Sequence, residues 1–409
     1  MYFKVKGTRD FFKADAILFE KIKNIFFKKA NIYNSSLIET PIFEYYNLFS
    51  RTSGEQSDIV NKEMYSFKDK GDRLIALRPE GTAPVARAII ENKLYLTNQK
   101  FHYFGPQFRY ERPQKGRFRQ FYQAGIEFLS PKNIYLDFEV LHFAVNFLKD
   151  LKIDGYTLKI NYLGSKEEKL LYINILKKYF TNFKDQLSDI SLERIEKNPL
   201  RILDDKVEQD KEFVKNAPKI IEVLSDESKD YFNKLTNLLK ENNIKFEIDY
   251  SLVRGLDYYN DLVFEFVSQS KALGTKTTLI GGGRYNHLFQ ELGGPEISAI
   301  GFAIGIDRIL EIIKYNSNIL INEYIDYYVG IINENEYELL LKVINKLRDL
   351  NYKVEFNKKN LSPKKIFEQA KKNNAKNIIF IEKNQNSFEF TVKNLINGKK
   401  EVFTLEKIN

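Results

Sequence analysis

The segment from Phe108 to Phe128, FRYERPQKGRFRQFYQAGIEF, constrains the fold of this chain more than any other stretch. Apolar and polar residues alternate at both of its ends, as in β-strands, and the middle, Arg112 to Arg117, has the composition of a turn. Five cationic residues and one acid lie between Phe108 and Gln120. The segment therefore predicts an antiparallel hairpin that holds several arginines, whose forked guanidinium groups suit phosphate. For the hairpin taken alone, a solvated basic face is the alternative.

Composition narrows the possibilities further. The 409 residues exceed what one hydrophobic core usually serves, so we expect two or three domains. The chain has no cysteine, and its three histidines, His102, His142 and His287, lie far apart, so we expect no disulfide, no metal site and structural roles for the histidines. Without an apolar run that suits a membrane span or a secretory signal, a cytoplasmic protein is expected. The formal net charge of +9 favours a polyanionic partner only mildly.

The hydrophobic pattern divides the chain into four segments of an α/β protein. Residues 1–164 and 246–322 carry helix and strand signals and are predicted to form one α+β domain with a mixed, mainly antiparallel sheet flanked by helices. Residues 165–245 are rich in lysine and glutamate and predict a helical insertion that splits this domain. Residues 323–409 alternate strands and helices, which is typical of a small α/β domain with a mostly parallel sheet.

Three local expectations accompany this division. The polar, irregular stretch from Asn47 to Lys62 is predicted to be a loop. Thr82 is expected to cap a helix that has Pro84 in its first turn. Lys314 to Glu323 is the expected linker before the last domain.

Four further motifs have unusual composition, and each has a plain structural alternative. In RPEGT, from Arg78 to Thr82, Glu80 can receive an ammonium group, although a simple helix cap also explains it. RGLDYY, from Arg254 to Tyr259, places an arginine beside two tyrosines, or forms a turn next to a strand. GGGRY, from Gly281 to Tyr285, allows close backbone approach to a ligand, or marks a bulge. GFAIGIDRI, from Gly301 to Ile309, exposes Arg308 at the start of a helix, or is a buried joint with a surface arginine.

The order and joint occurrence of these motifs resemble the class II aminoacyl-tRNA synthetases and, within that class, the histidyl-tRNA synthetase family. Pro41, after a helix and a short strand, resembles the first class-defining motif, which lies at the dimer interface. FRYERPQKGRFRQF is similar to the second motif and GFAIGIDRI to the third, while RPEGT and RGLDYY are similar to histidyl-specific motifs. The resemblance covers essentially the whole chain, and it makes residues 323–409 an anticodon-binding domain.

The resemblance implies ATP-dependent attachment of histidine to tRNA(His) through a histidyl-adenylate. It also implies ATP as a substrate, Mg²⁺, and a homodimer whose partners are tRNA(His) and L-histidine. Because the first step gathers negative charge on phosphate, preorganised cations should dominate catalysis, which suits a site rich in arginine and lacking a nucleophile.

Matching positions imply a role for each site residue. The catalytic cations would be Arg109 and Arg254. ATP would also contact Glu111, Arg117, Phe121 and Arg308. Histidine would be held by Glu80, Thr82, Gln123, Glu127, Tyr258 and Tyr259. The acceptor end of the tRNA would contact Arg112, Gln114 and Arg119. The sequence AGIEF departs from the family's usual residues around Glu127, so the packing behind that side chain is expected to differ.

Three other classes compete with this interpretation. A non-catalytic, synthetase-like regulatory subunit of ATP phosphoribosyltransferase would share the fold and bind histidine, but the intact arginines, the basic turn and the terminal domain argue against it. Another class II synthetase, such as a glycyl, threonyl or prolyl enzyme, is disfavoured by RGLDYY and Glu127. A generic basic RNA-binding protein would explain the charge but not the other motifs.

Overall fold

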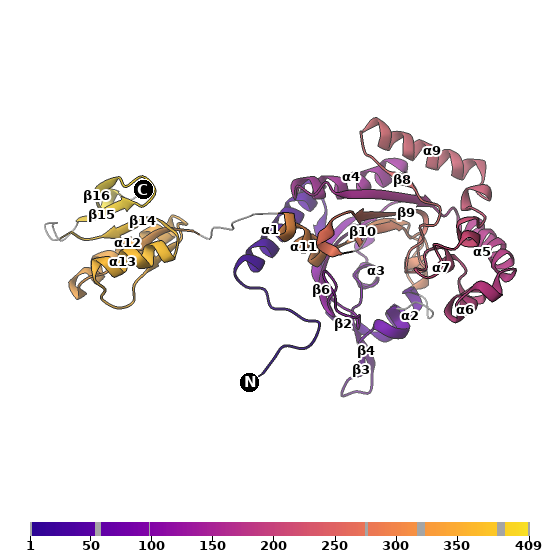
Figure 1. The fold of residues 1–409 in the computed structure, drawn as a ribbon, viewed down its shortest axis with the longest axis horizontal. Helices are drawn as coiled ribbons and strands as arrows, with labels where there is room; N and C mark the ends of the chain where they lie inside the picture. Colours follow the sequence, from indigo (N-terminus) through magenta and orange to yellow (C-terminus); the bar gives the residue numbers. More distant parts are fainter. Residues whose placement is uncertain are drawn as a thin grey trace. The chain divides into compact units, whose positions relative to one another are not determined.

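The computed structural model describes residues 2–53, 59–97, 99–274, 277–316, 324–382 and 389–407. The chain forms two compact units, Met1–Asn318 and Ile319–Asn409 (Figure 1). Among the helices in these described parts, none is both long enough and apolar enough to cross a membrane.

The first unit is built on a sheet of eight strands. In spatial order they are β1 (Ser36–Leu37), β5 (Lys100–Phe108), β6 (Gln120–Leu129), β11 (Ala299–Gly305), β10 (Thr277–Arg284), β9 (Asn260–Ser268), β7 (Tyr156–Tyr162) and β8 (Glu247–Ile248). The two edge pairs, β1–β5 and β7–β8, are parallel and the inner pairs are antiparallel. The predicted mixed, mainly antiparallel sheet is thus confirmed.

Helices α1 (Lys13–Ile32) and α4 (Ile134–Asp150) cover one face of this sheet. Leu18, Ile22, Phe26 and Ala30 recur every four residues along α1, so they form one buried stripe. The Phe26 ring lies 6.0 Å from that of Phe143 on α4, which in turn lies 5.6 Å from Phe302 on β11. Successive residues of a strand point to opposite faces of the sheet. The side chains of β5, β6 and β11 that alternate with those packed on α1 and α4 therefore point the other way, toward the first turn of α3 (Thr82–Glu91).

The expectation of a loop from Asn47 to Lys62 is wrong over most of its length. Helix α2 (Tyr46–Ser53) and a π-helical turn, η1 (Ile59–Glu63), occupy the described residues, while 54–58 lie outside them. Phe49 and Val60 are buried, so a few apolar residues within a polar stretch provide enough contact to fold it. The helix packs beside a small antiparallel sheet of β2 (Phe43–Tyr45), β4 (Leu74–Leu77) and β3 (Ser66–Lys68).

Residues 165–245 are helical, as predicted. The helices are α5 (Lys166–Thr181), α6 (Asp189–Lys197), α7 (Leu200–Leu203), α8 (Glu212–Lys215) and α9 (Asp226–Glu241). A capping box between Ser165 and Glu168 starts α5, and α9 lies along α4 (Figure 1). After β10 the chain forms the short helix α10 (Leu288–Glu291), and after β11 it forms α11 (Ile306–Asn316).

The second unit is a three-layer α/β domain. Its sheet has the order β13 (Val354–Phe356), β12 (Ile325–Val329), β14 (Ala375–Phe380), β15 (Glu389–Asn394) and β16 (Lys400–Thr404). The first three strands are parallel and the terminal hairpin is antiparallel. Val329 packs with α12 (Tyr337–Asp349) and its neighbour Tyr328 with α13 (Pro363–Lys372), so the two helices cover opposite faces. Most of the expected linker lies outside the described residues.

Candidate active site

A cavity of about 290 Å³ lies over strands β6, β11, β10 and β9. It brings together seven of the predicted site residues from three distant stretches of sequence. These residues are Arg109, Glu111, Arg117, Phe121, Gln123, Arg254 and Arg308. The cavity thus holds every residue that was expected to contact ATP.

The predicted hairpin forms one wall of this cavity. Its turn is closed by reciprocal backbone hydrogen bonds between Gln114 and Arg117, and Gly116 has a φ of +70°, which glycine adopts at little cost. The Nε of Arg109 donates to the Pro79 carbonyl at 2.9 Å, and its guanidinium lies 5.4 Å from the centre of the Phe121 ring. These contacts hold the arginine in place before any ligand binds.

The Arg254 guanidinium lies against Gly281, the first glycine of the run in β10. It pairs with Glu265 of β9, which also accepts a hydrogen bond from the Thr278 hydroxyl at 2.7 Å. A Cβ atom at Gly281 would overlap this guanidinium. The glycine therefore makes room for the Arg254 side chain. The sequence motif predicted close approach of a ligand or a bulge, and it did not indicate that a side chain of the protein itself occupies this space.

Arg308 borders the cavity as a half-buried side chain and does not extend from the surface as expected. Its Nη1 donates to the Thr278 carbonyl at 2.5 Å. Burial and the neighbouring charge of Arg117 lower the pKa of Arg308 to about 10, so the group stays cationic at neutral pH. The preceding residue, Asp307, accepts from the Tyr122 backbone N–H at 2.6 Å and pairs with Arg9 at 2.5 Å.

Glu127, further along β6, is the centre of a buried polar cluster. Its carboxylate accepts hydrogen bonds from the Thr82 hydroxyl, at 2.7 Å, and from the Tyr285 hydroxyl. Burial raises the pKa of Glu127 to about 8, although both hydrogen bonds act in the opposite direction. A Cβ atom at Gly301, the residue opposite on β11, would overlap the carboxylate. The packing behind Glu127 is therefore backbone.

Tyrosines surround this carboxylate. The ring of Tyr258 lies 4.6 Å from that of Tyr259 and 5.7 Å from that of Tyr285. Burial raises the pKa of Tyr259 to about 12. The Tyr258 hydroxyl and the Gln123 Oε1 are buried and have no hydrogen-bond partner among the described residues. The cluster therefore offers free polar atoms beside a carboxylate, as a site for a polar ligand would.

Glu80, and not Thr82, caps helix α3. Its carboxylate accepts from the backbone N–H groups of Thr82, at 2.6 Å, and Ala83, at 2.8 Å, because a carboxylate reaches these donors and complements the helix dipole. Thr82 instead turns its hydroxyl to Glu127. The expectation that Thr82 is the cap is therefore wrong, and the simple helix-cap alternative describes part of what Glu80 does. Burial raises the pKa of Glu80.

The residues expected to contact tRNA are on or near the turn of the hairpin. Arg112 and Gln114 are exposed. Arg119 is half-buried, its guanidinium 3.8 Å from the centre of the Tyr110 ring, and its backbone N–H donates to the Gly7 carbonyl at 2.7 Å. The first two side chains are free to meet a large partner, whereas the third also holds the N-terminal segment.

Sequence reasoning missed several residues that shape the site. Tyr285 is the last letter of the GGGRY motif, but only the fold brings it to Glu127. Nothing in the sequence distinguishes Glu265 from an ordinary polar residue of a strand. Arg78, the first residue of RPEGT, is buried and donates to the carbonyls of Thr40, at 2.8 Å, and Pro106, at 2.9 Å, so it anchors the motif.

The cavity suits Mg²⁺ bound mainly through phosphate. Among the residues that the structure describes, no three His, Asp or Glu side chains are grouped as metal ligands. Three acidic residues do border the cavity, Glu111, Glu265 and Asp307, and the last of these is already paired with Arg9. Mg²⁺ usually takes one or two carboxylates and completes its shell with water and substrate phosphates, so this donor set fits it.

Comparisons with known proteins agree on one family. The family model described as histidyl-tRNA synthetase matches residues 7–309. The histidine–tRNA ligase of Mesomycoplasma hyopneumoniae strain 7448 is 48% identical over 407 residues, covering 99% of this chain and 95% of the relative. That of Malacoplasma penetrans is 47% identical and covers 99% of this chain and 96% of the relative.

Solved structures give the same picture. The apo histidyl-tRNA synthetase of S. aureus has a TM-score of 0.84 at 33% identity and covers 99% of this chain and 98% of its own. A Bacillus halodurans protein, named as an ATP phosphoribosyltransferase regulatory subunit/histidyl-tRNA synthetase, has a TM-score of 0.64 at 21% identity. The match covers 87% of this chain and 93% of the Bacillus chain, and it is a similarity of fold alone. The chain belongs to the histidyl-tRNA synthetase family.

Proposed function

We propose that this protein attaches histidine to tRNA(His) at the expense of ATP, through a histidyl-adenylate. One observation carries the proposal beyond family membership. The arginine-lined cavity reaches Gln123 on β6, and Glu127, the centre of the buried cluster, follows on the same face of that strand. A site for a polyphosphate thus adjoins a site for a small polar side chain.

In the first step the carboxylate of histidine attacks the α-phosphorus of ATP, and pyrophosphate leaves. Arg109 and Arg254 would stabilise the charge that develops on the α-phosphate, and their contacts to Pro79 and Glu265 support this role because donors fixed in advance need no reorganisation. Adenine would stack between Phe121 and Arg308, with Glu111 at its edge and Arg117 near the distal phosphates. Bound Mg²⁺ would neutralise phosphate charge.

Histidine would bind in the Glu127 cluster. Glu127 and Tyr259, with Tyr258 beside it, would contact the two imidazole nitrogens. Glu80, Thr82 and Gln123 would hold the α-amino group. An amino acid without ring nitrogens would leave these buried polar groups unpaired, which is how such a site achieves selectivity.

In the second step the histidyl group passes to the terminal ribose of the tRNA. Arg112, Gln114 and Arg119 would contact the acceptor end, where phosphate contacts add affinity and base contacts add specificity. Residues 165–245 remain the proposed insertion domain and 323–409 the proposed anticodon-binding domain. The cytoplasm is the proposed compartment.

We also propose a homodimer that pairs through the small sheet that follows Pro41. Phe43 and Tyr45, at alternate positions of β2, are 57% and 58% exposed. Between them Glu44 points the other way and pairs with Arg87 of α3. An apolar face of this kind, opposite an anchored one, suits burial against a second copy.

Replacing Tyr45 by Asp should therefore dissociate the dimer, because a charge would enter an apolar interface. Sedimentation velocity would report the mass. Tyr135→Asp is the matched control, since Tyr135 is 70% exposed at the start of α4 and should leave the mass unchanged. A wild-type monomer, or equal effects of both variants, would contradict the proposed interface.

The experiment that tests the main proposal is ATP–pyrophosphate exchange with each amino acid supplied singly. Exchange with histidine alone is the expected result. No exchange with histidine would leave a non-catalytic histidine-binding subunit as the better description, and exchange with another amino acid would overturn the specificity.

A further inference from the structure

Asp261, near the start of β9, has an unusual backbone. Its φ is 50°, in the left-handed region that residues with a Cβ atom rarely adopt. The pairing register with β10 shifts at this point, between Gly283 and Arg284, as in a β-bulge. The side chain is buried, with 3% of the residue exposed. The chain therefore holds a buried carboxylate at an irregular point near the start of β9, directly after Tyr258 and Tyr259.

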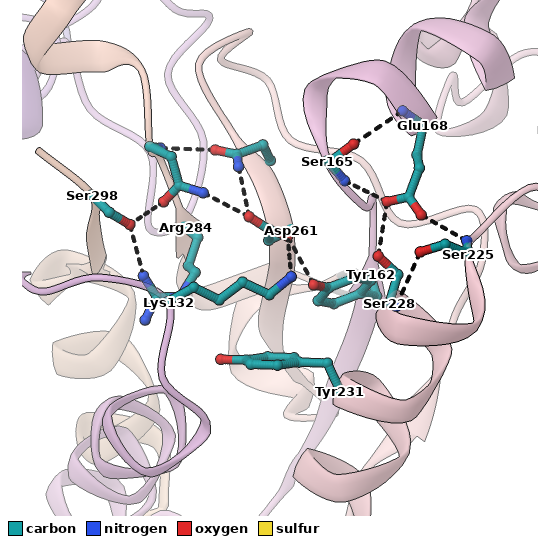
Figure 2. A network of polar contacts seen from close by, with 12 residues as sticks. Lys132, Tyr162, Ser165, Glu168, Ser225, Ser228, Tyr231, Asp261, Arg284 and Ser298 are labelled. Atoms are coloured by element: carbon teal, nitrogen blue, oxygen red, sulfur yellow. Dashed lines mark hydrogen bonds and ion pairs between the residues drawn. The ribbon is translucent and has the colours of Figure 1, made fainter. Parts of the chain in front are cut away.

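Four side chains from four segments converge on the Asp261 carboxylate (Figure 2). Oδ1 accepts from the Tyr162 hydroxyl at 2.8 Å and faces the Lys132 ammonium at 3.2 Å. Oδ2 accepts from the side-chain amides of Asn260, at 2.8 Å, and Asn286, at 2.6 Å. Both oxygens are thus fully used as acceptors, which explains why the strained backbone persists.

A second carboxylate, that of Asp137, is linked to the same network. Arg284 donates from Nε to Asp137 of α4 at 2.7 Å, and both side chains are fully buried. Tyr231 of α9 donates to the other oxygen of Asp137 at 2.8 Å. Ser298 links the two halves, because it accepts from Arg284 at 3.1 Å and donates to Asn286. Arg284 and Asn286 are therefore both held, one on each side of Tyr285.

These contacts fix two chain segments against each other. One segment presents Tyr258 and Tyr259 and continues directly into Asn260 and Asp261. The other presents Tyr285, whose hydroxyl donates to Glu127. The backbone N–H of Asn286 donates to the Asn260 side chain at 2.8 Å, so the two segments meet at the network itself.

We propose that Asp261 is a positioning residue for histidine recognition: its carboxylate joins the two segments that carry the tyrosines around Glu127. It contacts neither of the proposed substrates and acts through Tyr258, Tyr259 and Tyr285. This inference rests on the proposed function, because it assumes that histidine occupies the Glu127 cluster. Its effect should appear in histidine binding and not in ATP binding, since the contacts of Arg109, Arg254 and Arg308 lie outside the network.

The test is Asp261→Asn, which keeps the size of the side chain and tolerates the left-handed backbone. In either orientation its amide places an NH₂ group against two donors. We expect the KM for histidine in pyrophosphate exchange to rise by about tenfold, while the KM for ATP changes by less than about twofold. Asp261→Gly, which suits the backbone but removes the carboxylate, should raise the histidine KM at least as much.

Two further variants keep the test decisive. Asp249→Asn removes a carboxylate paired with Lys159, at 2.6 Å, beyond β8 at the far edge of the same sheet, and should leave both KM values unchanged. If Asp261→Asn does not fold, Lys132→Met removes the ion pair to Asp261, together with the contacts of the ammonium with the rings of Tyr162 and Tyr231, but keeps the carboxylate. It should raise the histidine KM by about threefold.

Failure of this inference can be told apart from failure of the proposed function. An active wild type combined with an unchanged histidine KM in the Asp261 variants, or in Lys132→Met where it replaces them, would overturn the positioning role alone. Equal rises in the KM values for histidine and ATP would also overturn it, because they would indicate a general structural role. A wild type without histidine-dependent exchange would overturn both proposals.

Discussion

At the scale of single residues, the charge of Glu127 results from opposing influences. Burial raises its pKa to about 8, while hydrogen bonds from Tyr285 and Thr82 lower it and the nearby Glu80 raises it again. In the unfolded chain the carboxyl group titrates near 4.5. Because the folded-state pKa is the higher one, the stabilising contribution is complete only below the unfolded-state value of 4.5 and is lost progressively as the pH rises from there through 8.

The Glu127→Gln variant should therefore gain stability relative to the wild type as the pH rises. The amide does not titrate, so the free energy of unfolding of the variant minus that of the wild type should increase between pH 5.5 and 8, by at most about 1.4 kcal/mol per pH unit. Thermal unfolding at several pH values measures this difference.

Asp249→Asn serves as the control for this prediction. Although burial alone would raise the Asp249 pKa, hydrogen bonds from Lys159 and Ser251 lower it below 3.8 overall, so its contribution is already constant in this pH range. A flat difference for Glu127→Gln, or an equal slope for both variants, would contradict the raised pKa.

Arg254→Ala should keep ATP and histidine binding but slow adenylate formation by about a hundredfold or more, which corresponds to about 2.7 kcal/mol. The reason is the loss of a cation already oriented by Glu265. Single-turnover rates of adenylate formation measure the effect. Arg194→Ala is a matched control, because the Arg194–Asp205 and Arg254–Glu265 pairs have the same side-chain exposures, 18% and 19%. Unchanged rates for Arg254→Ala would mean that another cation has this role.

Individual residues show how far a sequence can be read. The motifs identified seven residues that the cavity brings together, because a motif keeps its residue types in order along the chain. They did not reveal Tyr285 as the partner of Glu127, nor Glu80 as the cap in place of Thr82. The contact between Tyr285 and Glu127 depends on the pairing of strands β6, β11 and β10, which are far apart in sequence, and Thr82 leaves the cap because its hydroxyl donates to Glu127 of β6.

At the scale of elements, the β5–β6 hairpin separates two kinds of contact. Arg109, directly after β5, and Phe121, in β6, border the cavity, whereas Arg112 and Gln114, on the turn, are exposed. Alternation and turn residues predicted this hairpin, and the hydrophobic pattern predicted the helical character of residues 165–245. Helix α2 escaped prediction because Leu48 and Phe49 are buried against distant residues such as Ala76 and Ala83.

Arg112→Ala should raise the KM for tRNA on the order of tenfold and leave pyrophosphate exchange unchanged, because the side chain lies on the turn. It should also reduce the slope of log affinity against log salt by about 1 if the contact is to phosphate. Aminoacylation assays at several salt concentrations measure both. Lys152→Ala, an exposed cation in the turn after α4, should affect neither quantity. A parallel loss of exchange would contradict the division between strands and turn.

At the scale of the whole molecule, the two compact units have separate cores. The second unit has one cluster on each face of its sheet, around Val329 and Tyr328. From the strict alternation of strands and helices, the sequence predicted a small α/β domain here, and the structure confirms that architecture. The anticodon role of this domain stays a prediction.

A shortened chain that ends at residue 316 should therefore fold and activate histidine at nearly the wild-type rate. Its KM for tRNA should rise by at least about tenfold, because the positively charged terminal domain would no longer contribute phosphate contacts. Pyrophosphate exchange and aminoacylation on the same preparation distinguish the two effects. Loss of both activities in a folded chain would show that the terminal unit supports the first step as well.

The two glycines that lie against Glu127 and Arg254 limit how this enzyme can be re-engineered for other amino acids. Pockets are usually enlarged by shortening the side chains that line their base. Here Gly301 and Gly281 already have no side chain, and both positions are filled by neighbouring functional groups. To accept a bulkier amino acid, the pocket would have to lose the side chain of one of the tyrosines or of Glu127 itself. Such a change would remove groups that are proposed to bind the imidazole.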